Sequence, residues 1–121
     1  MNVLIAVFVG GGLGSLARFG VSSAVTSGFK MINPVGTLIA NIVSTIALGI
    51  ILYIASSKLG MSDNMKIFLI TGFCGGFSTF STFSYETFEL LRTGQIWFAT
   101  ANILVSVALG IGVLFAMAKN I

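Results

Sequence analysis

The sequence lacks most of the residues from which enzymes and metal sites are built. Its 121 residues include no histidine, one cysteine, one proline and three acidic residues. Histidine is the commonest acid–base group and metal ligand in proteins. Cys74 has no second cysteine with which to form a disulfide or a thiolate metal site. Because no nucleophile can be matched with a base, we do not expect an enzyme.

Charge of either sign is also scarce. Charged residues make up 7% of the chain and hydrophobic residues 56%, and the mean hydropathy is strongly positive. A soluble domain carries roughly a quarter charged residues, so this chain has too few charges to cover a water-facing surface. The net charge of +3 is spread along the chain, which argues against a nucleic-acid partner. The composition predicts an integral membrane protein whose surroundings are the lipid bilayer.

What the chain does contain is long hydrophobic runs. A bilayer core about 30 Å thick takes about 20 apolar residues of helix to cross. Four segments meet this requirement, at approximately residues 2–26, 34–57, 65–91 and 96–118. The first is too long for a signal-peptide core and has no small-residue cleavage site, so it counts as a span. The sequence predicts a single all-α domain over residues 1–121, with four transmembrane helices.

Basic residues near helix ends usually set the orientation of a membrane protein. With four spans, one side of the membrane would hold both termini together with Lys58, Lys66 and Lys119. The opposite side would hold Lys30, Arg92 and, in the outer part of the first helix, Arg18. This balance predicts insertion in both orientations and hence an antiparallel dimer, unless one extra charge or the N-terminal amine decides the orientation.

Ionisable residues inside the predicted spans are functional candidates, because each costs about 2.5–3.5 kcal/mol on insertion scales. They are Arg18, Glu86 and Glu89. Arg18 lies near enough to its helix end that its side chain either reaches the interface or draws anions towards a vestibule. Glu89 and Arg92, at i and i+3, favour a helix-end ion pair. Glu86 lies one turn deeper and has no such explanation.

Uncharged polar residues recur along two of the predicted helices. One stripe of the second span carries Thr37, Asn41 and Ser44, and one stripe of the fourth carries Asn102, Ser106 and Gly110. The amide donors of Asn41 must bond either another helix or a permeating species, because leaving them unpaired in an apolar setting is costly. Two polar stripes in one small bundle are typical of the lining of a path.

The third span contains the most unusual stretch, "TGFCGGFSTFSTFSYETFE", at residues 71–89. Each of its three glycines weakens helix propensity by about 1 kcal/mol relative to alanine. Gly75 and Gly76 therefore predict a helix break near the middle of the span. A break frees backbone carbonyls, which are hard oxygen ligands suited to an alkali cation, and a membrane tolerates this only where protein or water buries them. If helix resumes after Ser78, then Phe77, Phe80 and Phe83 form one ridge with hydroxyls beside it.

The alternation of phenylalanine with serine and threonine points to a small anion. Ring edges carry the positive part of the ring quadrupole, and hydroxyls donate hydrogen bonds. A path lined by these groups and an asparagine amide would bind a small anion weakly enough to release it, as conduction requires. Taken alone, the repeat favours hydroxyls bonded to their own helix and rings that face lipid. The glycine pair before it, together with Asn41, shifts the interpretation towards a small-anion path.

These stretches resemble the Fluc/CrcB fluoride channel family, and the resemblance runs along the whole chain. The matching stretches are "GGGLGSLARFG" in the first span, "NPVGTLIANIVST" in the second and "TGFCGGFSTFSTFSYETF" in the third. The resemblance implies an antiparallel homodimer with two pores. Such a dimer would pass fluoride selectively and passively out of the cytoplasm across the inner (plasma) membrane.

The resemblance also implies which residues line the pores. Phe80 and Phe83 would turn their ring edges towards fluoride, and Asn41 would project into the pore. The hydroxyls of a polar track would come from Thr37, Ser81, Thr82 and Ser106.

Five further positions take roles from the same resemblance. Backbone carbonyls of Gly75 and Ser78 from both subunits would hold a structural Na⁺ ion at the dimer interface. Arg18 and Glu86 match the family's first-helix arginine and third-helix glutamate, as vestibule or structural polar residues. Asn102 stands where many members carry tyrosine, so at that position a smaller amide would replace the usual contact with fluoride.

Two other functions also fit a chain of this size. A proton-coupled exporter similar to the small multidrug resistance transporters would be equally short, four-spanning and of dual topology. It needs an acidic residue in the first span, which this chain lacks, so Glu86 would have to substitute. A non-transporting membrane subunit would leave the polar stripes unexplained. Flux driven by a pH gradient would indicate the exporter, and absence of ion flux in pure liposomes would indicate the subunit.

Overall fold

The computed structural model describes residues 2–28, 33–57 and 60–118, and every regular element in them is helical. The first span is α1 (Val3–Ser23), continued by a π-helical turn, η1 (Ala24–Gly28). The second span is α2 (Asn33–Ser56), and the fourth is α6 (Ile96–Met117). The third consists of α3 (Asp63–Lys66), the π-helical η2 (Ile67–Cys74), α4 (Gly75–Phe77) and α5 (Phe80–Arg92).

Four helical stretches are long and apolar enough to cross a membrane, judged by length and composition. They are Val3–Gly28, Pro34–Ser56, Asp63–Arg92 and Ile96–Met117. The prediction of an all-helical fold with four membrane-spanning helices is therefore confirmed for the described residues. Of the basic residues on which the orientation argument rests, Lys30, Lys58 and Lys119 lie outside the described residues.

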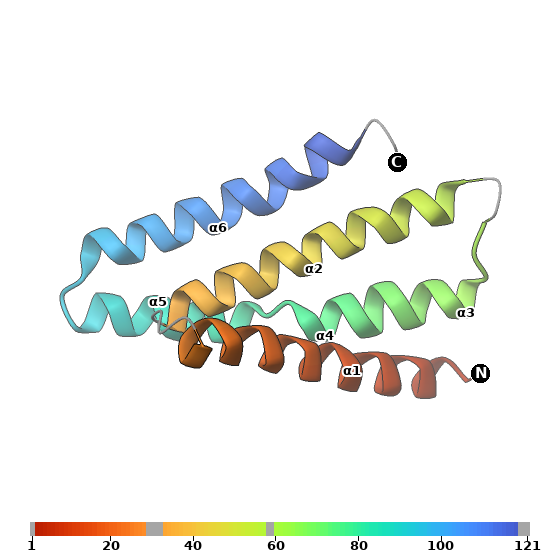
Figure 1. Ribbon diagram of the computed structural model, residues 1–121, viewed down its shortest axis with the longest axis horizontal. Helices are drawn as coiled ribbons and strands as arrows, with labels where there is room; N and C mark the ends of the chain where they lie inside the picture. Colours follow the sequence, from red (N-terminus) through yellow and green to blue (C-terminus); the bar gives the residue numbers. More distant parts are fainter. Residues whose placement is uncertain (1, 29–32, 58–59, 119–121) are drawn as a thin grey trace.

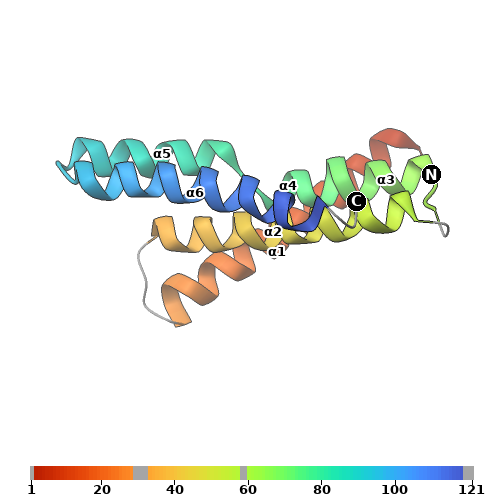
Figure 2. The ribbon, with the colours of Figure 1, turned by 90° about the horizontal axis from the view of Figure 1, so that it is seen from above.

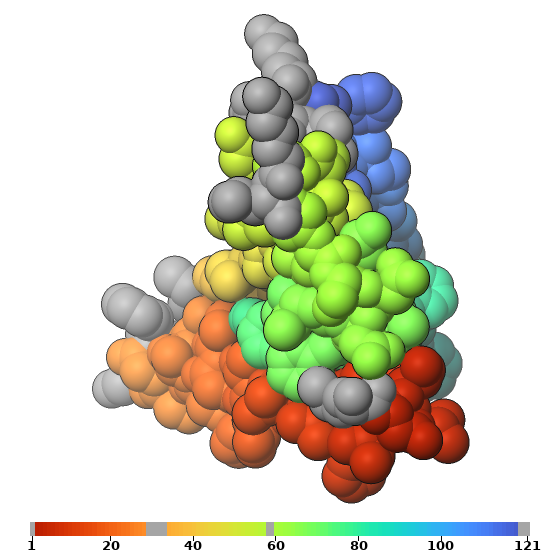
Figure 3. Space-filling view, turned by 90° about the vertical axis from the view of Figure 1, so that its right-hand side faces the viewer, coloured from red at the N-terminus to blue at the C-terminus, as the bar shows by residue number. Residues whose placement is uncertain are grey.

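The helices run lengthwise, in the order α6, α2, third span and α1 from one edge of the molecule to the other (Figure 1). The start of α1, the end of α2 and the start of α3 lie at one end, whereas the turn between α5 and α6 lies at the other. Seen from above, α1 crosses below its neighbours and η1 diverges from them (Figure 2). An end-on view shows α1 and α6 on different sides of the molecule (Figure 3).

Contacts between the helices follow this order. The first span packs most extensively on η2 and α4, which form the first half of the third span. On the other side, α6 packs on α2 and α5. The second helix, α2, lies between these groups and contacts α1, η2, α5 and α6. As a result, the two ends of the interruption that separates α4 from α5 both lie against α2.

Glycines bring α1 and the third span into backbone contact. A Cβ atom on Gly10 would lie 3.0 Å from the backbone nitrogen of Phe73, and one on Gly72 would lie 3.0 Å from the Cα of Gly10. A Cβ on Gly76 would strike the carbonyl oxygen of Gly11. Lipid tails are as apolar as leucine, so small residues that permit close backbone packing are a main source of helix association in membranes.

The interruption of the third span does not lie at the glycine pair, so its predicted position is wrong. Gly75 is helical (φ −64°, ψ −35°) and Gly76 lies inside α4. The extended residues are Ser78 (φ −85°, ψ 154°) and Thr79 (φ −148°, ψ 128°), and helix resumes at Phe80. The glycines leave room for α1, whereas extended dihedral angles are open to any residue and require no glycine.

Because helix resumes only at Phe80, the predicted ridge of three phenylalanines is also incorrect. Phe77 belongs to α4, is 5% exposed and packs edge-on against Phe73, with ring centroids 5.6 Å apart. Phe80 and Phe83 share the first turn of α5, with centroids 5.9 Å apart. The interruption therefore separates one core phenylalanine from the other two.

Candidate functional site

The polar stripe of α2 faces the third span along its whole length. Thr37 and Ser44 are buried, at 6% and 2% exposure. The Thr37 hydroxyl lies against the Glu86 carboxyl in α5, and Asn41 contacts the interruption itself. The stripe recognised in the sequence is thus one continuous polar seam between two helices.

Asn41 pairs with the backbone of the interruption. The Thr79 N–H donates to Asn41 Oδ1 at 3.0 Å, and Asn41 Nδ2 donates to the Thr79 carbonyl at 3.5 Å. One carboxamide therefore contacts both backbone groups of a residue that has left the helix. Of the two partners left open for Asn41, the structure contains the interhelical one. The 3.5 Å contact is long and a carboxamide nitrogen carries two N–H donors, so at least one donor remains for a ligand.

Thr79 is the residue at the centre of the site that the sequence analysis did not select. Its Oγ1 accepts from the Thr82 N–H at 3.3 Å and lies 3.2 Å from Ser81 Oγ. Thr79 is thus the N-cap of α5. A threonine immediately before a helix is a recognised N-cap signal, and that signal could have located the start of α5.

The Cys74 carbonyl, at the end of η2, accepts several hydrogen bonds just before the interruption. It accepts hydrogen bonds from Ser44 Oγ at 3.2 Å, Ser78 N at 3.1 Å and Ser78 Oγ at 3.0 Å. The Thr79 N–H, which would bond the Gly75 carbonyl in an uninterrupted helix, bonds Asn41 instead. The Gly75 carbonyl therefore loses its regular donor. Gly75 and Ser78 line an open pocket of about 200 Å³ beside Ser44.

The central pocket is an open cavity of about 270 Å³ between α2, α5 and α6. Its lining includes Asn41, Ser78, Thr79, Phe80, Phe83 and Ser106. Four residues selected from the sequence as pore-lining, on three helices, thus meet at one place, next to the interruption. No charged side chain lines this pocket in the described part of the chain. Its polar groups are side-chain hydroxyls, one carboxamide and backbone groups. The side chain of Phe80, at the edge of the pocket, is 81% exposed.

The remaining selected residues lie outside the central pocket. Ser81 is exposed and Thr82 half-buried, both in the first turn of α5. Asn102 lines a separate, mostly apolar pocket of about 140 Å³ and donates from Nδ2 to Thr87 Oγ1 at 3.0 Å. Arg18 is half-buried, and its Nε has no hydrogen-bond partner among the described residues.

Another open pocket lies at the end of the molecule that holds the α5–α6 turn. This end pocket has a volume of about 320 Å³, and its lining includes Pro34, Tyr85, Glu86, Glu89, Thr93 and Gln95. Glu86 connects it to the polar seam through Thr37, and Glu86 Oε1 is buried without a partner among the described residues. Both the end pocket and the central pocket are therefore lined by residues of α5.

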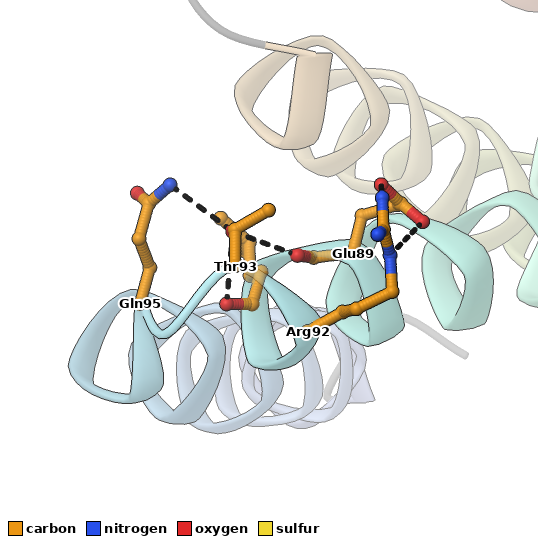
Figure 4. Close-up of polar contacts among 5 residues, drawn as sticks. Glu89, Arg92, Thr93 and Gln95 are labelled. Atoms are coloured by element: carbon orange, nitrogen blue, oxygen red, sulfur yellow. Dashed lines mark hydrogen bonds and ion pairs between the residues drawn. The ribbon is translucent and has the colours of Figure 1, made fainter.

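The rim of the end pocket carries the predicted ion pair. Arg92 Nη2 and Nε donate to the two carboxylate oxygens of Glu89 at 2.7 and 3.0 Å, which confirms the helix-end pair (Figure 4). Thr93 Oγ1 donates to the Glu89 carbonyl at 2.8 Å, and Gln95 Nε2 donates to Thr93 Oγ1 at 3.4 Å. These contacts close the turn between α5 and α6.

The central pocket has the chemistry of a weak anion site. Amide and hydroxyl donors carry partial positive charge, as do the edges of aromatic rings, and among the described residues no cationic side chain lines the pocket to hold an anion permanently. Binding that is favourable but weak is what conduction through a pore requires. Hydrolysis or group transfer would need a nucleophile beside a base, and the residues that line the central pocket include no such pair.

Known proteins match this chain over most of its length. The family model described as CrcB-like protein, Camphor Resistance (CrcB), matches residues 5–118. The fluoride-specific ion channel FluC of Pyrococcus horikoshii is 47% identical over 94% of this chain and 91% of that protein. FluC 1 of Yersinia pseudotuberculosis is 44% identical, over 88% of this chain and 84% of that protein. FluC of Hydrogenovibrio crunogenus is 46% identical, over 89% of this chain and 82% of that protein.

Proposed function

The chain belongs to the CrcB-like protein family, as its motifs indicated, and from this membership we propose that it is a passive, fluoride-selective channel. It is a multi-pass membrane protein, and its family consists of channels rather than enzymes. We infer fluoride as the substrate from the names of the relatives. The proposed direction is export from the cytoplasm across the cell's inner (plasma) membrane, down the fluoride gradient.

The observation that carries the proposal is the central pocket. Fluoride is a small, strongly hydrated anion, and leaving water requires replacement hydrogen bonds. The remaining Asn41 N–H and the Ser106 hydroxyl supply donors, and the rings of Phe80 and Phe83 supply positive edges. A path without a fixed cation releases the ion again, which a channel needs and a storage site does not.

The proposed route continues along the polar seam. Hydroxyls of Thr37, Ser81, Thr82 and Ser106 would form a track on either side of the phenylalanine pair. Glu86 and Arg18 would lie near its mouth, since each has a buried polar atom without a partner in the described residues. The end pocket, which contains Glu86, would be the vestibule on one side of the membrane.

The proposal includes an antiparallel homodimer with two pores, each lined by both copies. Support comes from Phe80, whose ring is 81% exposed although it borders the polar central pocket. A second copy would cover this ring and close the open side of the pocket. The even distribution of basic residues allows the two copies to insert in opposite orientations. A single copy would then be inactive.

A structural Na⁺ ion at the dimer interface is also part of the proposal, and the donor set fits it. The described residues hold no cluster of His, Cys, Asp or Glu that could bind a metal. The interruption instead frees backbone carbonyls, which are oxygen ligands of the kind that hard cations prefer. The carbonyls of Gly75 and Ser78 from the two copies would hold the ion. Bound there, it would supply positive charge that holds the two interruptions together.

Fluoride efflux from proteoliposomes tests the proposed function. Vesicles loaded with potassium fluoride are diluted into fluoride-free medium, valinomycin is added to carry potassium, and a fluoride electrode records release. We expect rapid fluoride release and little chloride release under matched conditions. Release that requires a pH gradient would point to a proton-coupled exporter, and absence of release would point to a non-transporting subunit.

Phe80→Ile tests the assignment of the pore. The variant removes the ring edge, and we expect flux to be lost when both copies carry it and partly lost when one copy of a covalently linked antiparallel dimer does. Phe115→Ile is the matched control, since Phe115 is also largely exposed (77%) but lies near the end of α6. Full fluoride flux with Phe80→Ile in both copies would contradict the assignment.

A further inference from the structure

The two helices of the α5–α6 hairpin pack on each other and are joined by one side-chain hydrogen bond among the described residues. In a membrane, helices gain no hydrophobic attraction for one another, so close packing and hydrogen bonds decide their register. Only Ala99 is buried among the residues of α6. Within the described residues, a single side-chain hydrogen bond joins α6 to α5, from Asn102 Nδ2 to Thr87 Oγ1 at 3.0 Å.

The Thr87 hydroxyl in that contact both donates and accepts a hydrogen bond. It donates to the Phe83 carbonyl at 2.8 Å and accepts from Asn102. Since a hydroxyl has one hydrogen, and that hydrogen points to Phe83, only the amide nitrogen of Asn102 can face it. Thr87 itself is buried, at 7% exposure. The bond therefore links the fourth span to the turn of α5 that carries Phe83.

One turn along the hairpin lies the central pocket. Asn102 and Ser106 are four residues apart on α6, and Thr87 and Phe83 are four apart on α5, so both pairs occupy shared helix faces. Because the helices run in opposite directions, a Thr87–Asn102 contact places Ser106 opposite Phe83. These two residues do line the same pocket.

From this geometry we infer that Thr87 and Asn102 are positioning residues, which hold the Ser106 hydroxyl at the anion path beside Phe83. The inference rests on the proposed function and gives Asn102 a role other than direct contact with fluoride. Asn102 does not line the central pocket, and one of its amide hydrogens is committed to Thr87. Loss of the bond lets α6 slide or rotate, and Ser106 leaves the path.

The first test compares fluoride efflux from variants of Thr87. Thr87→Val keeps the shape of the side chain and removes the hydroxyl, and we expect it to slow flux about three- to tenfold, the range that corresponds to one interhelical hydrogen bond. Thr87→Ser restores the hydroxyl and recovers most of the flux. The matched control is Thr100→Val, because the Thr100 hydroxyl bonds only its own helix, at Ile96, and Thr100 is exposed. Flux in Thr87→Val equal to that of the wild type overturns the inference.

A second comparison separates positioning from general destabilisation. If Thr87 acts through Ser106, then Thr87→Val has almost no further effect on flux in a Ser106→Ala background. If Thr87 had a merely structural role, Thr87→Val would slow fluoride flux by the same factor in the wild-type and Ser106→Ala backgrounds. That result would contradict the inference. Asn102→Leu should likewise slow fluoride flux in the wild type and have almost no effect in the Ser106→Ala background. The double variant Thr87→Val/Asn102→Leu should conduct fluoride no more slowly than either single variant.

A third measurement does not depend on conduction. In a Cys74→Ser background, Phe83→Cys and Ser106→Cys are introduced together, and a short bifunctional thiol reagent bridges the two thiols. The rate of bridging is compared with and without Thr87→Val. We expect the two thiols to be bridged rapidly when Thr87 is present and several-fold more slowly in the Thr87→Val variant. Unchanged bridging refutes the positioning role even if fluoride flux proves absent. Absent flux together with Thr87-dependent bridging refutes the proposed channel and leaves the register argument in place.

Discussion

Asn41→Ala is the substitution whose cost the structure specifies most closely. The alanine removes the acceptor of the Thr79 N–H, at 3.0 Å, and the donor to the Thr79 carbonyl, at 3.5 Å. The second contact is too long to count as a full hydrogen bond. The first is the only partner that the structure gives this N–H among the described residues, because Ser78 and Thr79 have left the helix. The variant therefore leaves a half-buried backbone donor unpaired.

The expected loss follows from that unpaired donor. A donor left without a partner away from water costs about 1–3 kcal/mol, so we expect Asn41→Ala to lower the free energy of unfolding by that amount. Ser44→Ala, on the same stripe, is the matched control. The Cys74 carbonyl that Ser44 contacts keeps two other donors, from Ser78 N and Oγ. The Ser44→Ala substitution should lower the free energy of unfolding by about 0.6 kcal/mol, the average for hydrogen bonds between membrane helices.

The assay is unfolding in mixed micelles by titration with a denaturing detergent, followed by circular dichroism and by the fluorescence of Trp97, the single tryptophan. The free energies of the wild type and both variants are compared at the same micelle composition. Equal losses for Asn41→Ala and Ser44→Ala would refute the reasoning, because the unpaired N–H would then carry no cost of its own. An unchanged free energy for Asn41→Ala would do the same.

Two further predictions concern packing and the surface. Gly76→Ala forces a methyl group against the carbonyl oxygen of Gly11, and overpacking of this kind costs about 1–3 kcal/mol in the same unfolding assay. Gly12→Ala is its control, since a Cβ there has no neighbour within 4 Å; similar losses for both would argue against the close contact. Glu89→Gln breaks the exposed pair with Arg92 and should leave the unfolding midpoint unchanged, because exposed ion pairs contribute little. A clear shift would mean that the pair is buried in the assembled protein.

The parts of the fold and site that could be predicted from the sequence all depend on residues close together in the chain. The spans follow from the length of the hydrophobic runs, because the bilayer fixes how many residues a helix needs. The stripe of Thr37, Asn41 and Ser44 follows from helical periodicity, which places such residues on one face whatever surrounds them. The Glu89–Arg92 pair is equally local, since three residues bring two side chains together on a helix surface.

The position of the interruption shows where local reasoning failed. Helix propensity pointed to Gly75 and Gly76 as the break, because glycine is a poor helix former. At Gly76 the missing side chain instead makes room for the backbone of Gly11. The chain leaves the helix at Ser78 and Thr79, where Asn41 on another helix accepts the backbone donor. Propensity contains no term for a partner that lies 38 residues away in sequence.

Asn102 is a second example. Its type and spacing placed it with Ser106 on one stripe, and the family resemblance placed both at the pore. Whether a residue on that stripe reaches the central pocket depends on the register between α5 and α6. In the structure Ser106 reaches the pocket, and Asn102 bonds Thr87 instead. A shift of one helical turn would exchange these roles without changing the sequence pattern.

The sequence by itself determined the class of this protein and the polar stripe of its second span, because the bilayer and the helix each impose a fixed length and period on the chain. It also indicated the family through three motifs, which the comparisons confirmed. Only the tertiary structure decided where the third span is interrupted, which donors surround the central pocket, and that Thr79 lies at its centre. Those features depend on contacts between different helices, and in a membrane such contacts are decided by close packing and single hydrogen bonds rather than by hydrophobicity.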